Sequence, residues 1–152
     1  MKKHSLGFNL IELSIVILVV GIISLVMVTW SPNTAIEAIT AEGFANTFYQ
    51  DLNYTKVLSN SKNQRYKIVV GAGSYQIQDQ NGTPVPDIQT GATSVVYPQG
   101  LTITPTTTLV FDSVGRPYTS GGTPLSSTLT FTVSAAGQTK NLSVIPQTGL
   151  VQ

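Results

Sequence analysis

The sequence has no cysteine, and its single histidine, His4, lies among the first seven residues. The absence of cysteine excludes disulfide bonds and metal sites built from thiolates. Without a second histidine, the rest of the chain cannot build a Ser-His-Asp or Cys-His catalytic site or an imidazole metal site. The residue inventory therefore argues against an enzyme, and we expect no cofactor and no metal.

Charged residues are scarce, at 10% of the chain, and eight Lys and Arg nearly balance seven Asp and Glu. Beyond residue 7, six basic side chains stand against seven acidic ones, and residues 83–152 hold only Arg116 and Lys140 as cations. Proteins that bind polyanions normally show a basic stripe. Here the cations are spread over a predicted helix and sheet, so we expect DNA binding no tighter than about 10⁻⁴–10⁻⁶ M.

Residues 13–30 form a stretch of 18 residues without a charge, of which 12 are Leu, Ile or Val. As a helix it would be about 27 Å long, enough to cross a hydrocarbon core. Lys2 and Lys3 before it favour a cytoplasmic N-terminus, which leaves the bulk of the chain on the other side of the membrane. The positions that we assign to this membrane anchor are Leu13, Ile17, Val20, Leu25 and Trp30.

An ordinary cleavable signal peptide explains this start less well. It needs a small-residue cleavage site after the apolar run, and the candidates near Ser31 and Ala35 are poor, with Pro32 directly behind Ser31. It also leaves Glu12 unexplained, because a carboxylate within a membrane segment is costly and points to a function.

The segment Gly7-Phe8-Asn9-Leu10-Ile11-Glu12-Leu13 resembles the leader of type IV prepilins and type II secretion pseudopilins. In that family a prepilin peptidase cuts after the glycine and methylates the new terminal residue, usually phenylalanine. A glutamate stands fifth in the mature chain. The resemblance thus implies cleavage between Gly7 and Phe8, N-methylation of Phe8, and a role for Glu12 in filament assembly. Asn9 departs from the commoner Thr or Ser.

The same resemblance implies the partners: other pilin or pseudopilin subunits, the prepilin peptidase, an inner-membrane assembly platform and membrane lipid. The expected location is the bacterial inner membrane, with a single pass and a periplasmic C-terminal head, and then a pilus or periplasmic pseudopilus. In the filament, the free amine of Phe8 and the Glu12 carboxylate of a neighbouring subunit would neutralise each other, since buried charges need partners.

Downstream of the anchor, Ser31-Pro32-Asn33 predicts a kink or restart of the helix. Apolar residues then recur at helical spacing from Ile36 to Thr55, with Glu37, Glu42, Gln50, Asp51 and Asn53 mostly on the opposite side, and Asn60-Ser61 ends the pattern. Helix aromatics, namely Phe44, Phe48, Tyr49 and Tyr54, are expected in the core beneath the sheet.

Beyond residue 64 the pattern changes to short strands separated by turns. The expected strands are 66–70, 75–79, 95–97, 101–103, 109–112, 129–134 and 142–145. The segments 81–94 and 117–127 are expected loops, the second the more prone to disorder. The expected fold is α+β, the pilin fold, with a long N-terminal helix, half transmembrane, packed on an antiparallel β-sheet. The expected parts are a leader (1–7), a transmembrane helix (8–30), its amphipathic continuation (31–60) and a β-sheet head (61–152).

The C-terminal half adds a looser resemblance. Leu109–Pro117, Leu129–Lys140 and Leu142–Val151 are similar to the tail of GspH/FimT-like minor pseudopilins. This favours a minor pilin or pseudopilin over the alternatives, which are a major pilin of the shaft and a competence pilin that binds DNA. The competence pilins of this kind use an arginine-rich tail, and this chain ends Gly149-Leu150-Val151-Gln152.

Three short motifs have simpler explanations than chemistry. Gly71-Ala72-Gly73 echoes a phosphate loop but is predicted to be a hairpin turn between two strands. Asp79-Gln80-Asn81-Gly82 echoes the start of a calcium loop but lacks the later acidic ligands, and Asn-Gly favours a hairpin. Asp112 and Arg116 bracket a turn and are expected to pair locally.

Processing can be read from the mass of the protein isolated from its native host. We expect loss of Met1–Gly7 and addition of one methyl group on Phe8. A chain that keeps residues 1–7, or one cleaved near Ser31, would contradict the prepilin interpretation.

Overall fold

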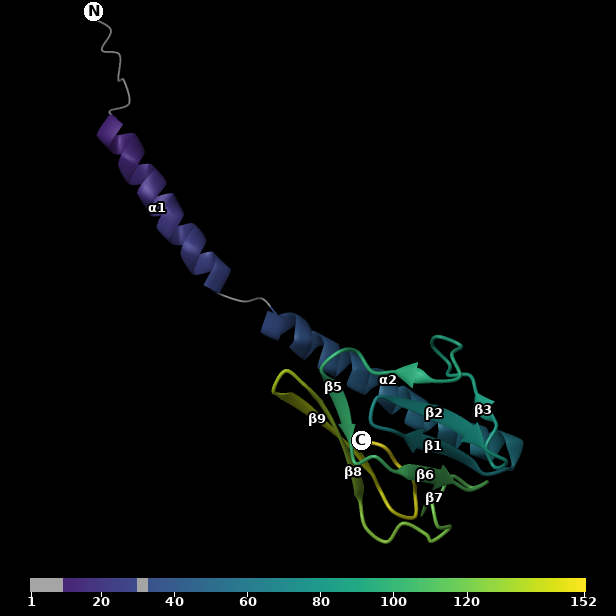
Figure 1. Ribbon diagram of the computed structural model, residues 1–152. Coiled ribbons are helices and arrows are strands. Elements are labelled where there is room, and N and C mark those ends of the chain that lie inside the picture. The colour runs from purple at the N-terminus through teal and green to yellow at the C-terminus, as the bar shows by residue number, and fades with distance from the viewer. Residues whose placement is uncertain (1–9, 30–32) are drawn as a thin grey trace, which may run out of the picture. The chain divides into compact units, whose positions relative to one another are not determined.

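The computed structural model describes residues 10–29 and 33–152, and for residues 21, 23–29 and 33–40 it describes the backbone only (Figure 1). The chain divides into two compact units, Met1–Thr34 and Ala35–Gln152. The helices are α1 (Leu10–Thr29) and α2 (Asn33–Lys62). The strands are β1 (Tyr66–Val70), β2 (Ser74–Asp79), β3 (Pro84–Val85), β4 (Val95–Val96), β5 (Leu101–Thr104), β6 (Thr108–Phe111), β7 (Pro117–Thr119), β8 (Leu129–Ala135) and β9 (Gln138–Val144).

The predicted α+β class is confirmed, but the strands form two antiparallel sheets and not one. The larger sheet has the order β3-β2-β1-β6-β7, with β4 pairing to β2, and the smaller has the order β5-β8-β9. Figure 1 shows α2 running behind β1 and β2. The two loops expected at 81–94 and 117–127 each contain a short strand, β3 and β7. Both strands begin at a proline, and with two and three residues they are too short to show the alternation by which a strand is predicted.

The helix α2 contributes the centre of the core of the second unit. Phe48 and Leu52 are fully buried, and the Phe48 ring lies 5.0 Å from that of Tyr75 in β2 and 5.3 Å from that of Phe131 in β8. Both contacts are edge-to-face, the arrangement that aromatic quadrupoles favour. One helical side chain therefore touches both sheets.

Two buried hydroxyls on α2 are satisfied by the helix itself. Thr55 Oγ1 donates to the Asp51 carbonyl at 2.6 Å, and Ser59 Oγ donates to the Thr55 carbonyl at 2.8 Å. The helix ends at Lys62, two residues past the expected boundary. Asn63 takes a left-handed φ of 50°, and Gln64 N donates to the Ser59 carbonyl at 3.2 Å, which closes the last turn.

Strand alternation follows the sequence closely where one face is buried. Tyr66, Ile68 and Val70 of β1 are buried while the residues between them are half exposed, and the hairpin through Gly71–Gly73 to β2 is confirmed. By contrast β9 begins four residues earlier than expected. A tight turn with positive φ at Ala136 and Gly137 extends its pairing with β8 to Gln138.

The C-terminal segment is held against β9 and α2. Ser143 and Gln152 exchange two backbone hydrogen bonds, and Ile145 N donates to the Leu150 carbonyl. From α2, Lys56 Nζ donates to the carbonyls of Thr148 at 2.8 Å and Gly149 at 3.2 Å. Gly149 has a positive φ of 61°, and a Cβ on it would lie 2.3 Å from the Gly115 carbonyl oxygen. Only glycine fits there without a shift of backbone.

We expect Gly149→Ala to lower the free energy of unfolding more than Gly137→Ala, measured by urea unfolding of the full chain in one detergent. Gly137 also has a positive φ, of 78°, but open space around it. The Gly137→Ala control should cost about 1–2 kcal/mol from the backbone conformation alone. Gly149→Ala should add about 1–3 kcal/mol, because the methyl group collides with a carbonyl. Equal losses would contradict the close approach of residues 115 and 149.

Candidate functional site

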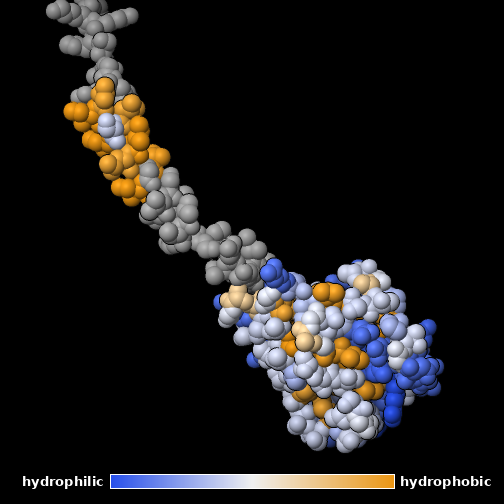
Figure 2. All heavy atoms as spheres, viewed as in Figure 1, coloured by the Kyte–Doolittle hydropathy of each residue, from blue (hydrophilic) through white to orange (hydrophobic). Residues whose placement is uncertain are grey.

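The described side chains of α1 are apolar around the whole circumference of the helix. Six consecutive residues, 15–20, are 45–65% exposed, and Leu10 is 80% exposed. Six consecutive residues span more than one helical turn, so no polar face remains. Figure 2 shows this apolar surface on the visible side of the helix. Glu12 is the only charged residue between Leu10 and Thr29.

The predicted site residues fall partly on this helix. Glu12, Leu13, Ile17 and Val20 are exposed residues of α1. Leu25 also belongs to α1, but only its backbone is described.

Gly7, Phe8 and Trp30 lie outside the described residues, as does most of the predicted interruption at 31–33. On the described part of the chain, no helix combines the length and the apolarity that a membrane crossing requires.

A buried carboxylate in α2 is the main feature that the sequence did not predict. Asp51 was expected on the polar side of the helix, and this was wrong: the residue is fully buried. The Tyr75 hydroxyl of β2 donates to Asp51 Oδ2 at 2.5 Å, while Asp51 Oδ1 is buried with no hydrogen-bond partner on the described part of the chain. A polar link between helix and sheet thus sits beside the aromatic core.

The environment shifts the acid–base behaviour of this pair. Burial raises the pKa of Asp51; the hydrogen bond from Tyr75 opposes this, and the negative charge of Asp87 adds to it. Burial also raises the pKa of Tyr75, and its bond to Asp51 raises it further. The neighbouring Tyr97, whose hydroxyl donates to the Gly71 carbonyl at 3.1 Å, has its pKa raised by burial to about 12.

Asp87 organises the loop that follows β3. Its Oδ1 accepts hydrogen bonds from Gln89 N at 2.7 Å and Thr90 N at 2.8 Å, and its Oδ2 accepts one from the Thr90 hydroxyl. Burial alone would raise the pKa of Asp87, but these hydrogen bonds outweigh burial and lower it. The side chain of Gln89 reaches Thr47 and Gln50 of α2, so the loop lies along the helix.

The helix aromatics behave less uniformly than expected. Phe48 is core, and Phe44 and Tyr54 pack partly buried against it, but Tyr49 is 38% exposed. Tyr49 was expected in the core, but it lies on the outer side of α2, next in sequence to the buried Phe48. The sequence pattern did not distinguish the buried side of the helix from the exposed side.

The acids in the turns bind backbone amides. The expected pairing of Asp112 with the Arg116 side chain was wrong, because Asp112 Oδ1 accepts from the backbone N–H groups of Val114 and Arg116 at 3.0 and 2.8 Å. Asp79 likewise accepts from Asn81 N and Thr83 N, which confirms the hairpin interpretation of Asn81-Gly82. Lys140–Glu42, at 3.1 Å, is the single ion pair on the described part of the chain.

Two solved structures share this fold. The minor pseudopilin EpsH of the type 2 secretion system of Vibrio cholerae superposes with a TM-score of 0.55 at 15% identity, over 74% of this chain and 94% of that one. The type IV minor pilin FimU of Pseudomonas aeruginosa gives 0.51 at 17% identity, over 80% and 90%. No protein-family model and no curated protein matches the sequence. The chain therefore has the fold of minor pilins and pseudopilins, as predicted.

The Asp51–Tyr75 link generates a pH-dependent stability. Because the pKa of Asp51 is raised in the folded state, its contribution is fully present below the unfolded value of 3.8 and is lost as the pH rises through the folded pKa. We expect the free energy of unfolding of the wild type, relative to Asp51→Asn, to fall as the pH rises from about 4. The slope should be about 1.4 kcal/mol for each pH unit between the unfolded and the folded pKa of Asp51.

The matched control is Asp87→Asn, which should show the opposite trend. The lowered pKa of Asp87 stabilises the fold above 3.8 and that contribution is lost at lower pH. The free energy of unfolding is measured by urea unfolding monitored with near-ultraviolet circular dichroism. If it depends on pH in the same way for the wild type and for Asp51→Asn, the pKa of Asp51 is not raised.

Proposed function

We propose that this chain is a structural subunit, a minor pilin or pseudopilin, of a type IV pilus-like filament or a type II secretion system. Its N-terminal helix would carry membrane insertion and assembly, and its β-sheet head would face the periplasm. The minor subunit is preferred to a major pilin because both solved structures that share the fold, EpsH and FimU, are minor subunits of their assemblies.

One observation carries the proposal: α1 is apolar all round, contains a single carboxylate, and belongs to the same chain as a pilin-fold head. A helix without a polar face is stable only where apolar surroundings cover it on every side, which means a membrane or a bundle of similar helices. A soluble monomer gives α1 neither. In a subunit that first resides in the membrane and is then packed into a filament, α1 is surrounded by lipid in the first state and by similar helices in the second.

The membrane anchor and the leader are proposed from the sequence. The uncharged run of residues 13–30 extends beyond the side chains described in α1, and the Gly7-Phe8 junction precedes it. In this proposal the prepilin peptidase cleaves and methylates at Phe8 in the inner membrane. An assembly platform then extracts the subunit from the lipid into a pilus or a periplasmic pseudopilus.

The proposed role is non-enzymatic. The acids of the head are occupied in structure, Asp51 by Tyr75, Asp87 by its own loop, and Asp79 and Asp112 by turns. None of these carboxylates stands beside a histidine or cysteine, since the chain has neither beyond His4. This supports a subunit that works through its surfaces.

The test concerns Glu12. In an assembled filament its carboxylate would neutralise the amine of Phe8 in a neighbouring subunit, because both groups lose water there. Glu12→Val should leave membrane insertion and cleavage intact, since the helix becomes more apolar and Gly7 is unchanged. Incorporation into sheared filaments or pseudopili should fall at least about tenfold, because the stranded amine costs several kcal/mol.

Ser14→Val is the matched control, because it makes the same helix more apolar, removing only a hydroxyl that donates to the Leu10 carbonyl. Glu12→Asp should lie between the wild type and the valine variant. The measurement is the ratio of processed membrane-resident subunit to assembled subunit. Normal incorporation of Glu12→Val would mean that Glu12 plays no part in assembly.

A further inference from the structure

Tyr118 of β7 contributes to two neighbouring hollows in the surface of the head. Tyr118 lines two hollows, one of about 190 Å³ that includes Arg65, Lys67 and Val110, and one of about 320 Å³ that includes Arg116, Pro124 and Leu125. We call the two hollows together the Tyr118 groove.

Three of its lining residues are positively charged and one, Asp79, is negatively charged. The fold has gathered charges that are far apart in the sequence. Arg65 and Lys67 flank the start of β1, and Arg116 directly precedes β7. Pairing of β6 with both β1 and β7 brings these strands together. Hydrophilic residues accordingly gather on the side of the head where α2 ends (Figures 1 and 2). The sequence interpretation, in which the cations were simply spread over helix and sheet, missed this cluster.

The nearby acids form no ion pair with these cations. Asp79 and Asp112 each direct Oδ1 at two backbone N–H groups of their own turns. Neither forms an ion pair, because the single pair on the described part of the chain joins Lys140 and Glu42. With three cations against one carboxylate and no ion pair among them, the groove keeps an excess of positive charge.

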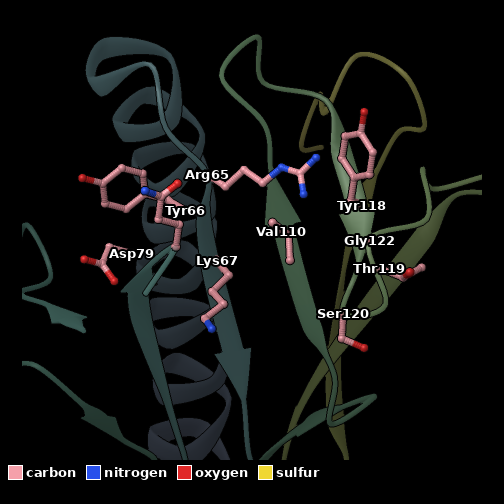
Figure 3. A pocket seen from close by; sticks show the side chains of 10 residues that line it. Arg65, Tyr66, Lys67, Asp79, Val110, Tyr118, Thr119, Ser120 and Gly122 are labelled. Atoms are coloured by element: carbon pink, nitrogen blue, oxygen red, sulfur yellow. The ribbon is translucent and has the colours of Figure 1, made fainter. Parts of the chain in front are cut away.

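Arg65 is already oriented across the groove. Figure 3 shows it extending from the start of β1 towards Tyr118, with Val110 between them, and its guanidinium carbon lies 5.3 Å from the centre of the Tyr118 ring. Stacking on an aromatic ring holds the guanidinium while leaving its N–H groups free for a carboxylate. Arginine and tyrosine together are typical of the centres of protein interfaces.

The rest of the lining favours a polypeptide ligand over a nucleic acid. Val110, Pro124 and Leu125 supply apolar walls, which peptide side chains can cover and a phosphate backbone cannot use. Arg65 covers one face of the Tyr118 ring, so that face is not open for stacking a base. Two small hollows that share one ring suit successive side chains of an extended segment.

We propose that the Tyr118 groove binds an acidic polypeptide segment of another protein, in which carboxylates alternate with apolar or proline residues. The carboxylates meet Arg65, Lys67 and Arg116, and the apolar residues lie against Val110, Pro124 and Leu125. This site is separate from the assembly role proposed for α1, and its success or failure leaves that role untouched.

The experiment uses the full chain in detergent and a short fluorescein-labelled peptide in which Glu alternates with Leu and Pro. Fluorescence anisotropy should show saturable binding that weakens as salt rises. The same peptide with Gln in place of every Glu should bind at least about tenfold more weakly, since each pairing of a cation with a carboxylate is replaced by a hydrogen bond to an uncharged amide. This comparison needs no change to the protein.

A double variant, Arg65→Gln with Lys67→Gln, should weaken binding of the Glu peptide by about tenfold or more. The matched control, Lys62→Gln with Lys140→Gln, removes the same charge from residues that do not line the groove and should change binding less than about twofold. Urea unfolding checks that both variants are folded.

Equal losses in the two double variants, or equal binding of the Glu and Gln peptides, would overturn the proposal. So would tighter binding of a single-stranded thymidine oligonucleotide than of the Glu peptide, because the ligand would then be a nucleic acid.

Discussion

The head depends on the contact of one helical ring with two sheets. Phe48 lies fully buried against Tyr75 of the larger sheet and Phe131 of the smaller one. Neither sheet has strands enough to enclose a core alone, and no disulfide is available to hold them together. The second half of α2 supplies the shared apolar surface, and Lys56 on the same helix fixes the C-terminal segment by its carbonyls. Helix, sheets and tail are thus stable only as one unit.

The parts of the fold that could be predicted are those in which neighbours in the sequence decide whether a residue is buried or exposed. The hairpin at 71–73 and the alternating strands β1 and β8 follow from side-chain periodicity and turn chemistry, and both were predicted. The residue Asp51 was not, because nothing in a helical wheel distinguishes an exposed acid from one that meets Tyr75 across the core. The short strands β3 and β7 were missed for a related reason. Two or three residues carry no period, and their pairing is decided by neighbours distant in sequence.

The candidate site shows the same division between local and distant information. Glu12 and the apolar run around it could be identified from the sequence, since α1 is one continuous segment in which the charge is conspicuous. The Tyr118 groove could not, because its cations come from residues 65, 67 and 116, and only the pairing of β6 with β1 and β7 makes them neighbours. A low overall charge hid a local excess, since the fold brings three cations beside one carboxylate.

This use of acids explains how a chain with few charges can still present an electrostatically distinct surface. Asp51 and Asp87 are buried, and Asp79 and Asp112 bind backbone amides, so all four aspartates are held by their local structure and none forms an ion pair with a basic side chain on the described part of the chain. The lysines and arginines of the head, with longer side chains, are all half-buried or exposed. In α1 the isolated charge is negative. Glu12 is the only charged residue of this apolar helix, and in the filament proposed above its positively charged partner would be the Phe8 amine of the next copy.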